Sequence, residues 1–161
     1  DAANDGTPVM SNHNTAVWDV LASKAQADAR QAKFRYDNAQ SRKDQAIARD
    51  ENVDQMLVEY AEKLNIIQRQ AHSASEAGNY RQFIVQLQSI KQDSSRELNL
   101  YSVDCAAASK VLQLAEQERH KYEQLAERAK EKQRFALMRR ETKDAEVQSM
   151  MQFNLRSRGQ S

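Results

Sequence analysis

The chain has 161 residues, of which 29% are charged and 6% aromatic, with three glycines, one proline and a formal net charge of +1. This composition is typical of long helices or coiled coils rather than a compact mixed domain, and the small net charge gives no reason to expect nucleic acid or an acidic membrane as a partner. No apolar run reaches the roughly 18 residues of a membrane span, and the single cysteine excludes an internal disulfide and fits a reducing cytosol.

The opening residues, DAANDGTPVM, lack the basic and apolar segments of a secretory signal. We expect residues 1–12 to be a vector-derived remnant and a disordered start, with Met10 as the native first residue.

A seven-residue repeat of apolar and small positions predicts one continuous helix over about residues 15–72. Asn14 or Thr15 is expected to cap its first turn. The repeat positions are Trp18, Ala22, Ala25, Ala29, Ala32, Tyr36, Ala39, Lys43, Ala46, Asp50, Val53, Leu57, Tyr60, Leu64, Ile67 and Ala71.

The stretch SASEAGN predicts a turn over residues 73–79, because small polar side chains and Gly78 favour chain reversal. The repeat then restarts and predicts a second helix over about residues 80–156, followed by a disordered tail, 157–161. Its seam positions are Tyr80, Ile84, Leu87, Lys91, Ser94, Leu98, Tyr101, Cys105, Ala108, Leu112, Ala115, Arg119, Tyr122, Ala126 and Ala129.

Two long helices joined by a short turn predict an all-α fold, a single antiparallel coiled-coil hairpin over residues 13–158. The second helix is longer and overhangs at its C-terminal end. A turn centred near Ser75–Glu76 predicts that Leu64 faces Leu87 and that Trp18 faces Gln133. The polar seam residues Lys43, Asp50, Lys91 and Ser94 either fix the register or loosen the middle of the seam, and the sequence leaves both interpretations open.

No catalytic or metal-binding constellation is found in the sequence. The histidines His13, His72 and His120 are interpreted as surface residues, and Cys105 lies on the seam as a small buried group. We therefore predict a protein that is not an enzyme, with no cofactor and no metal. The alternating charges from Glu116 to Arg140 are interpreted as a solvated helix face with i to i+4 ion pairs.

Two groups of apolar residues remain unexplained. Met56, Tyr60, Phe83 and Ile90 lie on or beside the seam near the turn, where they form either a docking surface or the shoulders of a wide seam. The overhang, residues 134–158, carries Phe, Leu, Val and Met side chains that the first helix does not reach, so a partner outside the chain is expected. Its acidic residues make membrane adsorption less attractive.

The sequence also resembles a known family. Glu59 and Tyr60 on the first helix, then Asn79, Tyr80, Phe83, Ile84 and Leu87 on the second, resemble the flagellar FliJ family. So does the charged stretch from Glu116 to Lys132. The resemblance covers most of residues 13–158. Injectisome stalk proteins share this architecture and stay an alternative, as does a generic structural coiled-coil adaptor that self-associates.

The resemblance implies a cytoplasmic component of the flagellar type III export apparatus, located at the inner face of the membrane at the flagellar base and serving motility and chemotaxis. It implies a central stalk in the hexameric FliI-like export ATPase, contact with the FlhA-like export gate protein, and the escort of export chaperones. It also implies a monomer in isolation, with no nucleic-acid partner and no integral membrane segment.

By the same resemblance, two sets of residues carry binding. The set that docks on the export gate is Arg49, Val53, Met56, Tyr60, Phe83, Leu87, Ile90 and Ser94. Arg49 and Ser94 depart from the amide and the imidazole expected at these positions. The set that contacts the ATPase pore is Arg134, Phe135, Met138, Arg139, Arg140, Met150, Met151 and Phe153.

Overall fold

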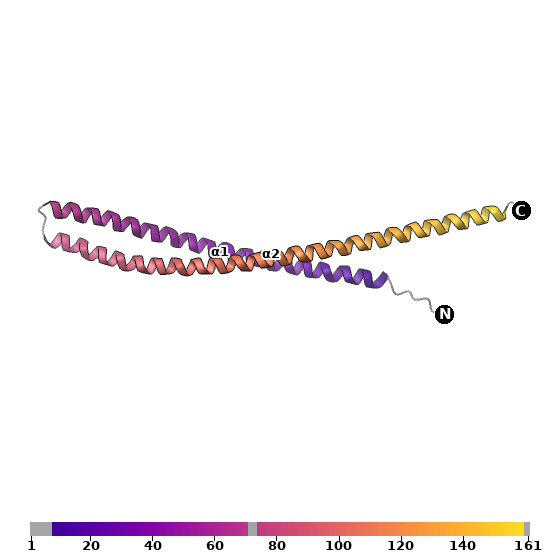
Figure 1. Ribbon diagram of the computed structural model, residues 1–161, viewed down its shortest axis with the longest axis horizontal. Coiled ribbons are helices and arrows are strands. Elements are labelled where there is room, and N and C mark those ends of the chain that lie inside the picture. The colour runs from indigo at the N-terminus through magenta and orange to yellow at the C-terminus, as the bar shows by residue number, and fades with distance from the viewer. Residues whose placement is uncertain (1–7, 71–73, 160–161) are drawn as a thin grey trace. The chain divides into compact units, whose positions relative to one another are not determined.

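A computed structural model describes residues 8–70 and 74–159, with side chains from residue 14 onward. These residues form two helices, α1 (Pro8–Arg69) and α2 (Ala74–Arg158), and no strand (Figure 1). The predicted all-α hairpin with a longer second helix is therefore confirmed. The chain divides into two compact units, which we call the terminal unit (Asp1–Ala29 with Ala115–Ser161) and the hairpin unit (Arg30–Leu114). Division into one functional domain, 13–158, stays a prediction.

The predicted start of the first helix is wrong. Helix α1 begins at Pro8, where proline is favoured because the first helical N–H groups have no partner within the helix. Thr15 is 8% exposed and lies inside α1, so it does not cap the first turn. The expected disordered start therefore does not include residues 8–12, and residues 1–7 lie outside the described part of the chain.

The C-terminal end of α2 agrees better with the prediction. Helix α2 ends at Arg158, directly before Gly159, whose N–H donates to the carbonyl of Leu155 at 3.1 Å. The predicted tail is thus helical at residues 157 and 158, and residues 160–161 lie outside the described residues.

The turn predicted over residues 73–79 is wrong from residue 74 onward. Helix α1 ends at Arg69 and α2 begins at Ala74, and residues 71–73 between them lie outside the described ranges. Gly78 is helical and exposed, without a positive φ. Local propensity misled the prediction here because a single glycine costs a helix only about 1 kcal/mol, and Glu76 places a carboxylate in the first turn, where the helix dipole favours it.

The predicted seam is confirmed at every position whose side chain is described. Each repeat position from Trp18 to Ile67, and from Tyr80 to Ala129, is buried or half-buried. The most deeply buried side chains are mostly small: Ala25, Ala29, Ala32, Ala46, Leu87, Cys105 and Ala126. Alanine on both helices lets the backbones approach closely, so the seam is narrow and leaves most of each helix in water.

The predicted register is wrong by about one heptad. In the hairpin unit Lys91 meets Asp50 and Asp54, and the Cys105 thiol lies 3.2 Å from the Gln40 side-chain oxygen. The prediction placed Lys91 opposite residue 60 instead. The cause is the misplaced turn: each residue by which the turn centre moves shifts the pairing by two residues.

The terminal unit contains the outer part of the seam and the unpaired end of α2. Trp18 packs on Tyr122 with ring centroids 6.4 Å apart, and Lys130 pairs with Asp19 at 3.6 Å. Beyond Gln133, every residue of α2 is exposed. Figure 1 shows this last part of α2, in yellow, without α1 beside it. The predicted i to i+4 charge pairing is also found, for example between Arg119 and Glu123 at 3.1 Å.

Gly78→Ala should stabilise the protein by about 0.5–1 kcal/mol, because alanine has the higher helix propensity. A Cβ at position 78 would meet no atom within 4 Å, so no clash opposes this gain. Urea unfolding followed by circular dichroism measures the change. Ala106→Gly, at an exposed position in the same helix, is the matched control and should lose a similar amount. A destabilised Gly78→Ala protein would show that residue 78 is not helical in solution.

Candidate functional site

An aromatic cluster joins the two helices of the hairpin unit near the start of α2. The Tyr60 ring lies 4.5 Å from the Phe83 ring and 5.9 Å from the Tyr80 ring, measured between centroids. The Lys63 ammonium lies 4.8 Å from the centre of the Tyr60 ring. All three aromatic residues are half-buried, so the cluster closes the seam while each residue stays partly exposed to solvent.

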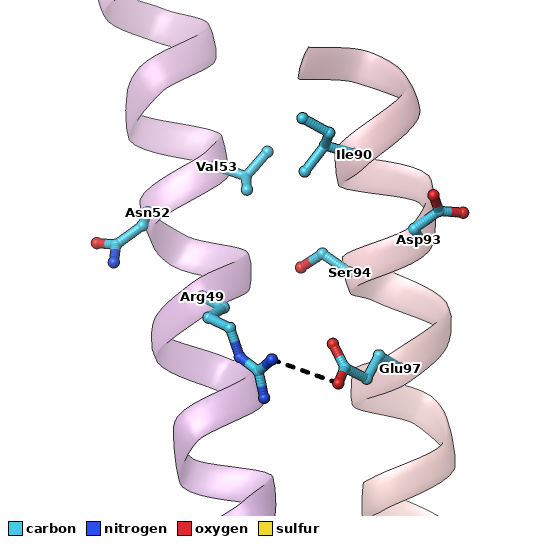
Figure 2. Close-up of a pocket in the computed structure, with 7 residues that line it drawn as sticks. All are labelled: Arg49, Asn52, Val53, Ile90, Asp93, Ser94 and Glu97. Carbon is cyan, nitrogen blue, oxygen red and sulfur yellow. Dashed lines mark ion pairs between the residues drawn. The ribbon is translucent and has the colours of Figure 1, made fainter. Parts of the chain in front are cut away.

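A groove follows the aromatic cluster along the same pair of helices. Its volume is about 590 Å³, and it is lined by Arg49, Asn52, Val53, Ile90, Asp93, Ser94 and Glu97. Figure 2 shows Val53 and Ile90 pointing toward each other across the groove, with Asn52 and Asp93 on its outer edges. The Arg49 guanidinium pairs with Glu97 at 3.4 Å and links the helices at one end of the groove (Figure 2). The groove thus has an apolar pair, Val53 and Ile90, at one end and an ion pair, Arg49 and Glu97, at the other.

A polar network lies beside the groove, within the seam. The Lys91 ammonium donates to Asp50 at 2.8 Å and to Asp54 at 2.7 Å. Asp50 also accepts hydrogen bonds from the hydroxyls of Ser94 at 2.9 Å and Ser95 at 3.2 Å. The side chain of Asp50 is only 15% exposed, whereas that of Asp54 is 56% exposed. Helix α1 therefore supplies the two carboxylates, and α2 supplies the three side chains that donate these hydrogen bonds to them.

This network shifts the pKa values of its two central groups. Hydrogen bonds from Lys91, and then from Ser94, hold the pKa of the Asp50 carboxyl below its ordinary value of 3.8. Hydrogen bonds to Asp50, and then to Asp54, raise the pKa of Lys91 above its ordinary value of 10.5. Both shifts favour the charged forms, so the network is an ion pair throughout the neutral pH range.

The residues predicted to dock on the export gate fall into three groups. Arg49, Val53, Ile90 and Ser94 line the groove, and Tyr60 and Phe83 belong to the aromatic cluster. Met56 is exposed on α1, whereas Leu87 is only 2% exposed and is a core residue of the seam. A buried side chain offers no surface to a partner, so Leu87 packs in the seam and does not itself form part of a docking surface.

Sequence reasoning missed three residues of the groove, Asn52, Asp93 and Glu97. Each lies three residues after a predicted one on the same helix face, namely after Arg49, Ile90 and Ser94 respectively. An extension of the predicted set by one helical turn on both helices would have found these residues.

The residues predicted to contact the ATPase pore are all exposed and all lie on the unpaired part of α2. Exposed apolar side chains here are Phe135, Leu137, Met138, Val147, Met150, Met151, Phe153 and Leu155. They occupy many angular positions on the helix, so no single flat partner would cover them all. Arg134 lies 3.4 Å from Glu127 on the same helix.

The described residues were also examined for a metal site and a membrane span. Among them, no group of three or more His, Cys, Asp or Glu side chains is arranged to hold a metal ion. Among the same residues, no helix is long and apolar enough to cross a membrane. Cys105 is buried on the seam, as predicted.

These features define a class of protein, the antiparallel coiled-coil hairpin with exposed apolar surfaces. The family model of the flagellar FliJ protein matches residues 19–158, which is most of the chain, so the chain belongs to the FliJ family. The resemblance found in the sequence is thereby confirmed. A search of curated proteins and a search of solved structures each gave no match. Members of this family are non-catalytic components of flagellar protein export, and this chain is such an export-related protein.

Asp50→Asn should reduce the loss of stability in acid. Because the pKa of Asp50 is lowered in the folded state, its ion pair contributes stability above the unfolded pKa and loses that contribution as the pH falls through the folded pKa. Asp50→Asn should therefore be less stable than the unsubstituted protein at pH of about 7, and the difference should shrink toward pH of about 3. Thermal unfolding at a series of pH values measures it.

Asp54→Asn is the control for this experiment, because Asp54 contacts the same ammonium but is largely exposed, where solvent screens the pair. Its stability difference from the unsubstituted protein should be smaller at neutral pH. Equal effects of the two substitutions would show that the network is not held in the seam.

Proposed function

We propose that this protein is the central stalk of the hexameric flagellar export ATPase, that it couples this ATPase to the export gate protein, and that it escorts export chaperones. The protein acts in the cytoplasm at the inner face of the membrane, at the base of the flagellum. The observation that carries the proposal is the unpaired part of α2, where every side chain from residue 134 to residue 158 is exposed. Membership of the FliJ family supports a role in flagellar protein export.

The unpaired part of α2 suits a partner that surrounds it. Methionine is abundant there, and its flexible thioether adapts to irregular apolar surfaces. The arginines Arg134, Arg139 and Arg140 offer planar donors to carboxylates and carbonyl oxygens. A pore formed by a ring of subunits presents contacts from all sides, which fits apolar residues at many angular positions.

The groove of the hairpin unit suits a different partner. It offers a small apolar contact between Val53 and Ile90 at one end, with the Arg49–Glu97 ion pair at the other. An apolar contact bordered by charged groups resembles the core and rim of known interfaces, in which a few residues carry most of the binding energy. We assign this groove, with the Tyr60 and Phe83 cluster beside it, to the export gate protein.

Ile90→Ser should weaken binding to the purified export gate protein by about tenfold, which is about 1.4 kcal/mol. Ile90 is 51% exposed and lines the groove, so its loss should leave the hairpin folded. Phe83→Ala should weaken binding further, by about 2 kcal/mol in total, because it removes an aromatic anchor. Isothermal titration calorimetry measures both, with helicity checked by circular dichroism.

Val85→Ser is the matched control for Ile90→Ser, because Val85 is also more than half exposed on α2 but does not line the groove. It should bind the gate protein like the unsubstituted chain. If both substitutions weaken binding equally, the groove is not the docking surface. If Phe83→Ala unfolds the hairpin, the aromatic cluster is part of the core instead.

Deletion of the residues after Gln133 should abolish stimulation of the export ATPase and leave gate binding intact. Every seam residue up to Ala129 remains in this truncated chain, so the midpoint of thermal unfolding should change little. ATP hydrolysis by the purified hexamer, with and without the added protein, is the measurement.

The deletion both shortens α2 and removes its apolar side chains. A full-length variant tells these two effects apart. Replacing Phe135, Met138, Met150, Met151 and Phe153 together with serine should also abolish stimulation, whereas Lys143→Ser, an exposed polar change in the same segment, should not. Full stimulation by the five-fold variant would mean that this segment does not act in the pore.

A further inference from the structure

A stripe of exposed apolar side chains runs along α2 on the face that turns away from the seam. Its residues are Leu100, Val103, Ala107, Val111 and Leu114. The four large ones are between 52% and 67% exposed. The seam side chains of the same stretch, such as Cys105 and Leu112, are buried or half-buried. Neither the seam nor the groove uses this stripe.

The spacing of the stripe is that of a second helix–helix seam. Steps of three and four residues keep all five side chains on one face of the helix over about 21 Å. The surrounding sequence is poor in charge, since only Asp104 and Lys110 are charged between Leu98 and Ala115. In a chain with 29% charged residues, an uninterrupted apolar face at helical spacing indicates a surface that another helix covers.

The order of residues in the stripe is symmetric about Ala107. Leucine lies seven residues away on each side, and valine lies four residues away on each side. A two-fold contact requires this property, because residue i of one copy meets residue j of the other and residue j meets residue i. Two antiparallel copies of α2 crossing at Ala107 would place leucine against leucine and valine against valine. The small alanine would lie at the closest approach.

We propose that the face of α2 centred on Ala107 is a self-association surface, on which a second copy of this chain binds antiparallel by a two-fold axis. The apolar stripe supplies the contact, and its symmetric order of leucine, valine and alanine sets the register. The contact is short and belongs to the class below about 1,200 Å², so the dimer is weak and reversible. The monomer remains the form that acts in export, and the proposal does not depend on the stalk role.

Sedimentation equilibrium of the full chain, at loading concentrations from about 10 µM to about 1 mM, tests whether the dimer forms. The average mass should rise from that of the monomer toward that of the dimer. A chain that stays monomeric over this range overturns the proposal, and the stripe would then belong to a different protein partner.

Leu100→Glu with Leu114→Glu should abolish the dimer, because the two-fold axis brings four carboxylates into the apolar contact. Val58→Glu with Val85→Glu is the matched control, since both valines are exposed in the hairpin unit and lie outside the stripe. The control should dimerise like the unsubstituted chain, and both variants should keep their helicity. Dimers that persist in the first variant would overturn the proposal.

A charge exchange within the stripe tests the antiparallel register. Leu100→Glu with Leu114→Lys should dimerise at least about tenfold more tightly than Leu100→Glu with Leu114→Glu, because an antiparallel contact places each carboxylate against an ammonium at two symmetric places. A parallel dimer would place like charges together in both variants, so an equal loss of the dimer in the two variants contradicts the proposed contact.

Discussion

The structure depends on a seam that only two helices share. A helix has one face that a single neighbour can cover, so two helices bury two narrow strips and leave the rest in water. The buried side chains of this seam are mostly alanine, and among the described residues no large side chain is completely buried. Close packing of small residues, repeated over many turns, therefore replaces the broad core of a globular domain. Each surface that we propose for binding follows from this narrow seam, because side chains outside the seam remain exposed.

The polar network around Asp50 gives this seam a distinct layer. Alanine layers resemble one another, so a slip by one heptad would again place small residues opposite small residues. The contact of Lys91 and two serines with Asp50 has no equivalent one heptad away, and a slip would leave a largely covered carboxylate without its donors. Of the two interpretations of the polar seam residues, the network therefore favours the one in which they fix the register over the one in which they loosen the seam. It also holds α1 and α2 together where the groove opens beside them.

Three exposed apolar surfaces differ in form, and their forms fit different partners. The groove is short, with the apolar pair Val53 and Ile90 at one end and an ion pair at the other, which suits a local docking contact. The end of α2 has apolar residues around its whole circumference, which only a surrounding partner could cover. The stripe centred on Ala107 is straight and symmetric, so it matches a second copy of itself. A two-helix fold can carry three such surfaces because burial places so few demands on the faces away from the seam.

The sequence by itself determined which side chains are covered. Trp18, Tyr36, Leu64, Leu87 and Cys105 were all placed on the seam by the seven-residue period, since a helix turns by a fixed angle per residue and the period alone identifies its buried face. The same reasoning found the exposed end of α2 and half of the groove.

Only the tertiary structure decided which layers meet. Residue 78 is helical although glycine favours turns, and the helices consequently pair about one heptad away from the predicted register. That shift brings Lys91 to Asp50 and opens the groove between Val53 and Ile90. Periodicity could not supply this information, because a repeated pattern fits itself equally well after a shift by one repeat. The choice was made by contacts between residues distant in the sequence, above all by the polar layer that has a single matching position.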